Sequence, residues 1–191
     1  MNRRQFIVAG GLVSASCLST DLSAQVPATA DIGYLQDMTV HHLQALSMCR
    51  RVLGRDTGDA VQGAAAEVLE NQAMEVGQMR AWLADWGAST VPVTTVMAWM
   101  GANQGAGMPI TMMPGYASDE ELLELSTLTG WDRGRRWLEL MRAHHIGGVA
   151  MAEQASILAS SAKVVTLANL QVAAQNYEIS QYDFLLAGVY Q

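Results

Sequence analysis

Apolar positions recur at steps of three and four residues along four long stretches of the chain, which is the spacing of one face of an α-helix. Polar and glycine-containing breaks at residues 54–59 and 159–161 suit turns between helices. The pattern therefore predicts four long helices: one over about residues 31–53, a second ending near 86, a third over about 131–158 and a fourth ending near 188.

A long connection separates the second and third predicted helices. Residues 87–116 hold three of the four prolines, several glycines and five methionines, so we expect this segment to lie outside the core. A short helix should follow, because Ser118 is a good N-cap and Glu121 stands three residues later, at the spacing of a capping box. Thr129 and Gly130 should end it.

The chain matches itself at an offset of 103 residues without a gap. The matched pairs include Leu35 with Leu138, Met38 with Met141, His41 with His144, His42 with His145, Met48 with Met151, Gln72 with Gln175 and Glu75 with Glu178. The repeat divides the chain into a helical hairpin at 31–87, a connector with a short helix at 88–130 and a second hairpin at 131–188. The predicted fold is all-α, a ferritin-like four-helix bundle built from two repeated hairpins with a long crossover connection.

Most of the repeated residues are potential metal ligands, and an antiparallel hairpin brings them to one level. Residues that are equally far from the turn lie side by side in such a hairpin. This reflection about each turn pairs a histidine with a glutamine and a methionine with a glutamate: His41 with Gln72, Met38 with Glu75, His144 with Gln175 and Met141 with Glu178. Adjacent residues lie about 100° apart around a helix, so only one histidine of each His-His pair should point directly inward.

The expected metal ligands are His41, His42, His144, His145, Met38, Met48, Met141, Met151, Glu75 and Glu178. Thioether and imidazole groups together favour copper, especially Cu(I), and a nearby carboxylate extends the range to Cu(II) or zinc, with iron as a further alternative. A structural interpretation stands beside this one, because methionines at helical spacing commonly fill a core and glutamates suit a helix surface. Cys49 has no sulfur counterpart at Ala152, so it is expected to be a small buried residue.

The N-terminal residues have the pattern of an export signal. Arg3 and Arg4 precede an apolar run that ends in small residues, so residues 1–24 are predicted to be a cleaved, twin-arginine-like signal peptide. The apolar run of roughly 13 residues is shorter than the ~20 that a membrane-spanning helix needs, so no stable membrane insertion is expected after cleavage. The mature protein should be periplasmic or otherwise exported, and Cys49 alone cannot form an intrachain disulfide.

The motifs together resemble those of a known family. They are Met38-x-x-His41-His42-x-x-Ala45-x-x-Met48, Gln72-x-x-Glu75-Val76-x-x-Met79, Met113-Pro114-Gly115-Tyr116-Ala117-Ser118 and Met141-x-x-His144-His145-x-Gly147-Gly148-x-x-Met151. From Asp31 to its C-terminus the chain resembles the domain-of-unknown-function family 305, ferritin-like helical proteins of bacteria, some of which bind copper in the periplasm. The resemblance implies copper binding or tolerance rather than catalysis. The chain departs from the family pattern at Leu140, where an acidic residue is common, and at Tyr182, where methionine is expected.

Three functions follow from these observations. The first is an exported, non-enzymatic copper-binding protein that buffers or carries the metal. The second is a ferritin-like di-metal oxidoreductase, although the chain contains no Glu-x-x-His motif of the kind that builds di-iron sites. The third is a metal-free helical interaction module.

The charge of the chain limits its partners. The net charge is −7 and the eleven lysines and arginines are scattered, so nucleic acid is not expected to bind. The expected partners are a metal ion and either a second copy of the chain or a metal-transfer protein.

Overall fold

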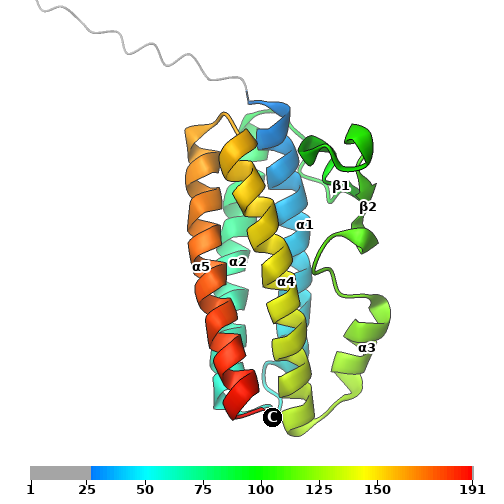
Figure 1. Ribbon diagram of the computed structural model, residues 1–191, viewed down its shortest axis with the longest axis vertical. Helices are drawn as coiled ribbons and strands as arrows, with labels where there is room; N and C mark the ends of the chain where they lie inside the picture. The colour runs from blue at the N-terminus through cyan, green and yellow to red at the C-terminus, as the bar shows by residue number, and fades with distance from the viewer. Residues whose placement is uncertain (1–26, 191) are drawn as a thin grey trace, which may run out of the picture.

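Within residues 27–190, four long helices lie side by side, and a smaller segment covers one flank of them (Figure 1). The computed structural model describes residues 27–190, so the predicted signal peptide at 1–24 lies outside the described residues. The long helices are α1 (Thr29–Val52), α2 (Asp59–Asp85), α4 (Gly130–Leu158) and α5 (Ala162–Gly188). Each begins and ends within about two residues of its predicted position. None of the helices within residues 27–190 has the length and apolar character that crossing a membrane requires.

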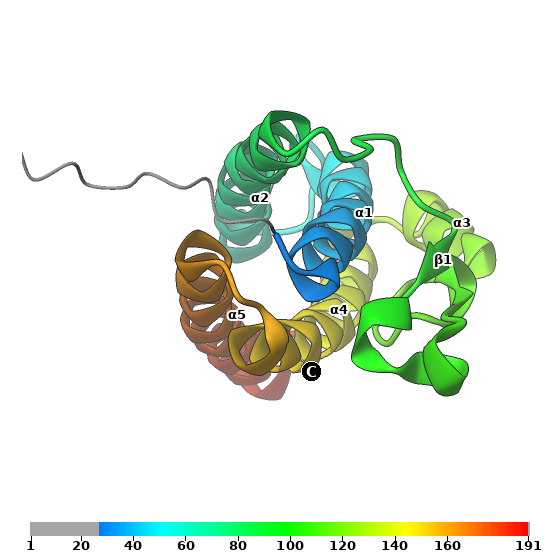
Figure 2. The ribbon, with the colours of Figure 1, turned by 90° about the horizontal axis from the view of Figure 1, so that it is seen from above.

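Seen from above, the long helices stand at the corners of a square (Figure 2). Helix α1 packs against α2 within the first hairpin, α4 packs against α5 within the second, and α1 packs against α4 between the hairpins. Asp31 ties the start of α1 to the turn of the second hairpin, because its carboxylate accepts hydrogen bonds from the backbone N–H groups of Ser160 and Ser161, at 3.1 and 2.9 Å. The two hairpins are thus joined along α1 and α4.

The apolar core falls into two clusters with polar residues between them. On α1, the first cluster holds Tyr34 to Met38 and the second holds Ala45 to Val52, while the intervening His41 and His42 are fully buried. On each of the other three helices, polar residues likewise lie between residues of the two clusters: Gln72 and Glu75 on α2, His144 and His145 on α4, and Gln171, Gln175 and Glu178 on α5. A polar layer therefore crosses the middle of the core.

The connector is more ordered and more buried than the sequence predicts. It contains the strands β1 (Thr95–Val96) and β2 (Met108–Pro109), which pair antiparallel, the 3-10 helices η1 (Ala98–Met100), η2 (Ala102–Gly105) and η3 (Ile110–Met112), and helix α3 (Asp119–Thr127). The expectation that 87–116 lies outside the core was wrong for Val96, Met97 and Met113, which belong to the first apolar cluster. Most of the segment is exposed or half-buried, as expected. The small sheet is also an addition to the predicted all-α fold.

Long-range hydrogen bonds hold the connector against α1. The buried carboxylate of Asp37 accepts hydrogen bonds from the backbone N–H of Met97 at 2.6 Å and from the indole N–H of Trp99 at 2.8 Å. The side chain of Gln44 exchanges two hydrogen bonds, each of 2.8 Å, with the backbone of Ala117. These polar anchors explain why an apparently loose segment is packed.

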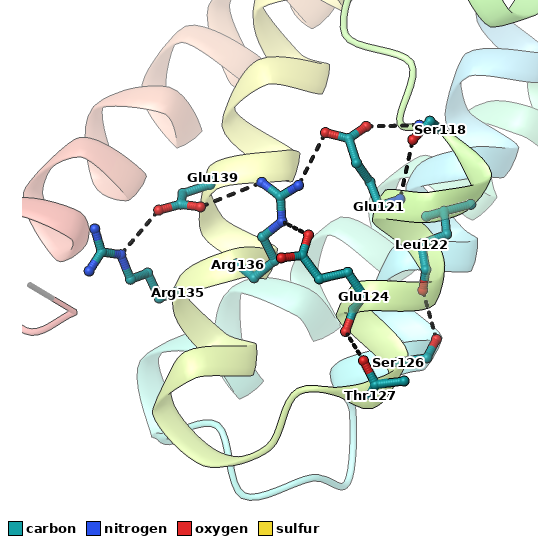
Figure 3. Close-up of polar contacts among 9 residues, drawn as sticks. All are labelled: Ser118, Glu121, Leu122, Glu124, Ser126, Thr127, Arg135, Arg136 and Glu139. Carbon is teal, nitrogen blue, oxygen red and sulfur yellow. Dashed lines mark hydrogen bonds and ion pairs between the residues drawn. The ribbon is translucent and has the colours of Figure 1, made fainter.

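The predicted capping box at the start of α3 is confirmed (Figure 3). Ser118 Oγ accepts a hydrogen bond from the backbone N–H of Glu121 at 3.2 Å, and the Glu121 carboxylate accepts one from the backbone N–H of Ser118 at 2.8 Å. Arg136 of α4 then bridges Glu121 and Glu124 of α3 at 3.1 and 2.7 Å. The short helix is thereby attached to the outside of the bundle.

Candidate metal centre

All four histidines of the chain are fully buried. The prediction that only one histidine of each pair points inward was therefore wrong. Helix α1 packs against two of the long helices, so adjacent side chains can face different helices. His41 faces His144 of α4, and His42 faces Glu75 of α2. Consecutive side chains point about 100° apart around a helix, so one can point from α1 toward α4 and the next toward α2.

His41 and His144, which occupy the same position in the two repeats, stack on each other. Their ring centroids are 3.6 Å apart and their planes differ by 29°. His144 Nε2 lies 2.9 Å from the backbone carbonyl oxygen of His41, and because a carbonyl can only accept, Nε2 carries the hydrogen. In the neutral ring this leaves the lone pair on Nδ1. Burial, then the neighbouring imidazoles, lower the pKa values of His41 and His144 well below the usual 6.5, so both rings are neutral at physiological pH.

His42 is held by a chain of hydrogen bonds. Its Nε2 lies 2.6 Å from Glu75 Oε2, and the Gln171 amide donates to the same oxygen, also at 2.6 Å. The hydroxyl of Tyr34 in turn donates to Gln171 Oε1. Burial alone would raise the pKa of Glu75, but the hydrogen bond and charge of His42 and the hydrogen bond from Gln171 outweigh it, so the pKa lies below its usual 4.5.

His145 forms the matching pair in the second repeat. Its Nε2 lies 2.6 Å from Glu178 Oε2, and its ring meets Tyr182 edge-on with centroids 5.5 Å apart. The surroundings differ from those of His42, because the repeat positions of Gln171 and Tyr182 are Val68 and Met79 in the first hairpin. The two repeats thus share a His-Glu pair and differ in what lies around it.

The carboxylates pair with the imidazoles and not with the methionines. Reflection about the turns predicted Met38 beside Glu75 and Met141 beside Glu178, whereas the structure joins Glu75 to His42 and Glu178 to His145. Helical side chains lean toward the N-terminus of their own helix, so in an antiparallel hairpin they lean toward each other. A glutamate therefore reaches a residue about one turn farther along the partner helix.

The four expected methionine ligands are buried on both sides of the polar layer. Met38 and Met151 belong to the first apolar cluster, and Met48 and Met141 belong to the second. Gly148 leaves room within the layer, as expected, because a Cβ at that position would lie 2.3 Å from Gln175 Oε1 and 3.1 Å from His41 Cε1.

Several ring nitrogens of the layer have no hydrogen-bond partner within residues 27–190. They are Nδ1 and Nε2 of His41 and Nδ1 of His42, His144 and His145, and the amide oxygens of Gln72 and Gln175 share this state. An unpaired buried polar atom costs about 1–3 kcal/mol. In a neutral imidazole with its hydrogen on Nε2, the free Nδ1 is the atom that can bind a metal ion.

Oxygen and nitrogen ligands alone do not complete a site. Among the described residues, no group of three or more His, Cys, Asp or Glu side chains is placed to hold a metal ion. Cys49 is buried, and burial raises the pKa of its thiol to about 12, so it offers no thiolate and packs as the small residue that was expected. A metal ion in this layer would have to draw on thioether sulfur as well as imidazole.

A comparison with known protein families supports the resemblance that the motifs suggested. Residues 31–186 match the sequence model of the domain of unknown function DUF305. The chain belongs to the DUF305 family.

Solved structures share the DUF305 fold of this chain. A DUF305 protein of Streptomyces coelicolor is 36% identical with a TM-score of 0.75, over 83% of this chain and 92% of that one. A DUF305 fragment of Deinococcus radiodurans is 28% identical with a TM-score of 0.71, over 84% and 97%. CopM in its Cu(I)-bound form is 22% identical with a TM-score of 0.65, over 84% and 98%, which shows a shared fold. No curated protein matches the chain.

Two residues near the histidines were not predicted from the sequence: Tyr34 and Gln171. Gln171 carried a usable signal, since Val164, Leu167 and Ala168 form an apolar stripe on α5 that continues at three- and four-residue steps into Gln171 and Gln175. A polar residue on such a stripe has to find a buried partner. Tyr34 looks like an ordinary core residue in the sequence. Tyr182, singled out as a departure from the family pattern, contacts the His145 ring.

Proposed function

We propose that this DUF305 protein binds copper in the polar layer of its core and buffers or carries the metal outside the cytoplasm. The observation that supports this most directly is the set of buried Nδ1 atoms on His41, His42, His144 and His145, none of which has a partner among the described residues. Each would bind the metal as a neutral imidazole, with sulfur supplied by the buried Met38, Met48, Met141 and Met151.

The hydrogen bonds of the layer favour this use of the rings. A carboxylate or carbonyl that accepts from Nε2–H fixes the ring orientation and leaves Nδ1 free, which is the usual arrangement around metal-binding histidines. Glu75 and Glu178 would therefore orient His42 and His145 and would not bind the metal themselves. With the carboxylates engaged, the remaining ligands are imidazole and thioether, a set that favours Cu(I) over zinc and iron.

The solved relatives support the same proposal. CopM, which shares the fold, has been solved with Cu(I), with Cu(II) and with Ag. Two repeated hairpins joined by a long crossover fit the ferritin-like class of helical bundle. Export fits the predicted signal peptide and the description of the Streptomyces coelicolor relative as a candidate secreted protein.

A non-enzymatic role fits the ligand set better than a di-metal oxidoreductase does. Carboxylate-bridged di-iron sites use glutamates as direct ligands together with Glu-x-x-His motifs, and the sequence has no such motif. Purified protein that holds iron with the absorption of an oxo-bridged pair would favour the oxidoreductase instead.

The test is a Cu(I) competition titration of the mature protein and of the double variant His41→Ala/His144→Ala. Loss of groups that only orient a ligand costs 10–100-fold in affinity, so loss of two ligands should weaken Cu(I) binding by more than about 100-fold. Met74→Ala is the control, since Met74 is 62% exposed on α2. Circular dichroism establishes that the variants remain folded. Unchanged affinity in the double variant would favour the metal-free interaction module.

A further inference from the structure

Helices α2 and α5 are neighbours in the bundle (Figure 2). A groove of about 380 Å³ between them opens to solvent. Glu67 and Asp59 of α2 and Glu178 of α5 line it, and no lysine or arginine does. The other groove between the same two helices has the opposite character, because Lys163 lines it, with its ammonium group 4.9 Å from the ring centroid of Trp82. Of these two grooves, the one at Glu178 suits a cation.

This groove leads directly to the polar layer. Glu178, whose side chain is 20% exposed, lines the groove and also accepts the hydrogen bond from His145 Nε2 at 2.6 Å. Tyr182 lines the groove too and contacts the His145 ring edge-on. The side chains of Glu178 and Tyr182 therefore lie between the groove and the buried His145 ring.

The equivalent carboxylate in the first repeat is held more firmly. Glu75 Oε2 accepts hydrogen bonds from both His42 and Gln171, and Gln171 is fixed in turn by Tyr34. Val68 stands at the repeat position of Gln171 and cannot donate, so Glu178 has His145 as its hydrogen-bond partner within residues 27–190. Both carboxylates are partly exposed, Glu75 at 27% and Glu178 at 20%, so the difference lies in their hydrogen bonds. With one hydrogen-bond donor against two, Glu178 is freer to rotate than Glu75.

We propose that the groove between α2 and α5 is the route by which the metal ion enters and leaves the polar layer, with Glu178 as its gate. The three carboxylates raise the local concentration of cations at the opening. Rotation of Glu178 into the groove exposes the His145 ring, and its return closes the layer. This inference rests on the proposed copper binding and adds the path and the moving group.

Gly63 offers a way to close the route without touching the layer. It lines the groove on α2, and a Cβ at this position would meet nothing within 4 Å. Gly63→Trp should therefore fill the groove without backbone strain. Gly77→Trp is the matched control, since Gly77 lies on the same exposed helix, has the same open space and does not line the groove.

The experiment is stopped-flow transfer of Cu(I) from each variant to a colorimetric chelator, together with the equilibrium affinity. A blocked route lowers the association and dissociation rates by the same factor, so Gly63→Trp should slow transfer by about tenfold or more while its affinity stays that of the wild type. Gly77→Trp should behave as the wild type. If Gly63→Trp transfers Cu(I) as fast as the wild type and its affinity is intact, the proposed route is wrong and the proposed copper binding still stands.

A second readout needs no metal. In the metal-free protein, exchange of the His145 Nε2 hydrogen with solvent, followed by nuclear magnetic resonance, should be slower in Gly63→Trp than in Gly77→Trp. Slower exchange without any copper binding in the wild type would overturn the proposed function and leave the groove as the path to His145. Unchanged hydrogen exchange would overturn the gate.

Discussion

The imidazole rings of His41 and His144 stack at 3.6 Å, and His144 donates a hydrogen bond to the backbone of His41, so the equivalent residues of two repeats meet at the centre of the molecule. The contact joins α1 to α4 and places neutral ring nitrogens in the core. It has consequences for stability, for metal affinity and for the tolerance of neighbouring positions.

Stability of the metal-free protein should fall as the pH drops below about 6.5. Burial lowers the pKa values of His41 and His144 in the folded state, so below the unfolded-state pKa the unfolded chain binds more protons than the folded one. Each histidine then costs up to about 1.4 kcal/mol per pH unit. Urea unfolding at pH 7.5 and 5.5 measures the slope, which should become much flatter in His41→Gln/His144→Gln. Glu75 acts in a lower window, because its stabilising effect is lost as the pH falls below 4.5. An equally steep slope in the double variant would contradict this assignment.

Copper affinity should depend on carboxylates that do not touch the metal. Glu75→Gln and Glu178→Gln remove the charge that holds Nε2–H of His42 and His145 and favours a free Nδ1. Each should weaken Cu(I) binding by about 10–100-fold in a competition titration. Glu153→Gln, on the exposed face of α4, is the control and should leave the affinity unchanged. Wild-type affinity in both layer variants would show that the carboxylates are structural only.

Replacing a buried methionine by leucine should weaken Cu(I) binding and change the stability of the fold only a little. Leucine conserves the volume of methionine, so Met38→Leu and Met151→Leu should change the free energy of unfolding by less than about 1.5 kcal/mol. Loss of a soft thioether should nevertheless weaken Cu(I) binding by about tenfold, because Cu(I) prefers sulfur ligands. Met74→Leu, which changes an exposed side chain, controls for general effects. Affinity that does not change in either buried variant would assign these methionines to packing.

Gly148 should not tolerate a methyl group. A Cβ there would approach Gln175 Oε1 to 2.3 Å and His41 Cε1 to 3.1 Å, so Gly148→Ala should destabilise the fold by about 1–3 kcal/mol. Gly77→Ala is the matched control, because open space surrounds that position and alanine favours helix by about 1 kcal/mol. The two variants should therefore shift the urea midpoint in opposite directions. A stabilising effect of Gly148→Ala would mean that the layer can relax.

The sequence predicts the local elements of this fold better than its long-range contacts. The four long helices follow from apolar spacing, and the capping box of α3 follows from Ser118 and Glu121, because both depend on residues a few positions apart. Burial of the connector depends on Asp37 meeting Met97, 60 residues later, and no periodic pattern encodes that contact.

The same distinction applies to the candidate site. The repeat identified the histidines and glutamates of the layer, since the duplication shows them as matched pairs. It did not predict that His42 pairs with Glu75 or that Gln171 joins them, because those contacts depend on side-chain direction and on a residue with no polar counterpart. The metal-binding role of these residues stays a prediction.

The polar layer also determines how the two hairpins align. Sliding one hairpin along the other by a single turn would press imidazoles against the two apolar clusters. It would also take His144 away from the His41 carbonyl and Gln171 away from the Glu75 carboxylate. A purely apolar interface would permit such misaligned neighbours at little cost, as in coiled coils that lack a buried polar residue. The histidines thus specify the axial registration of the bundle, whether or not a metal is bound.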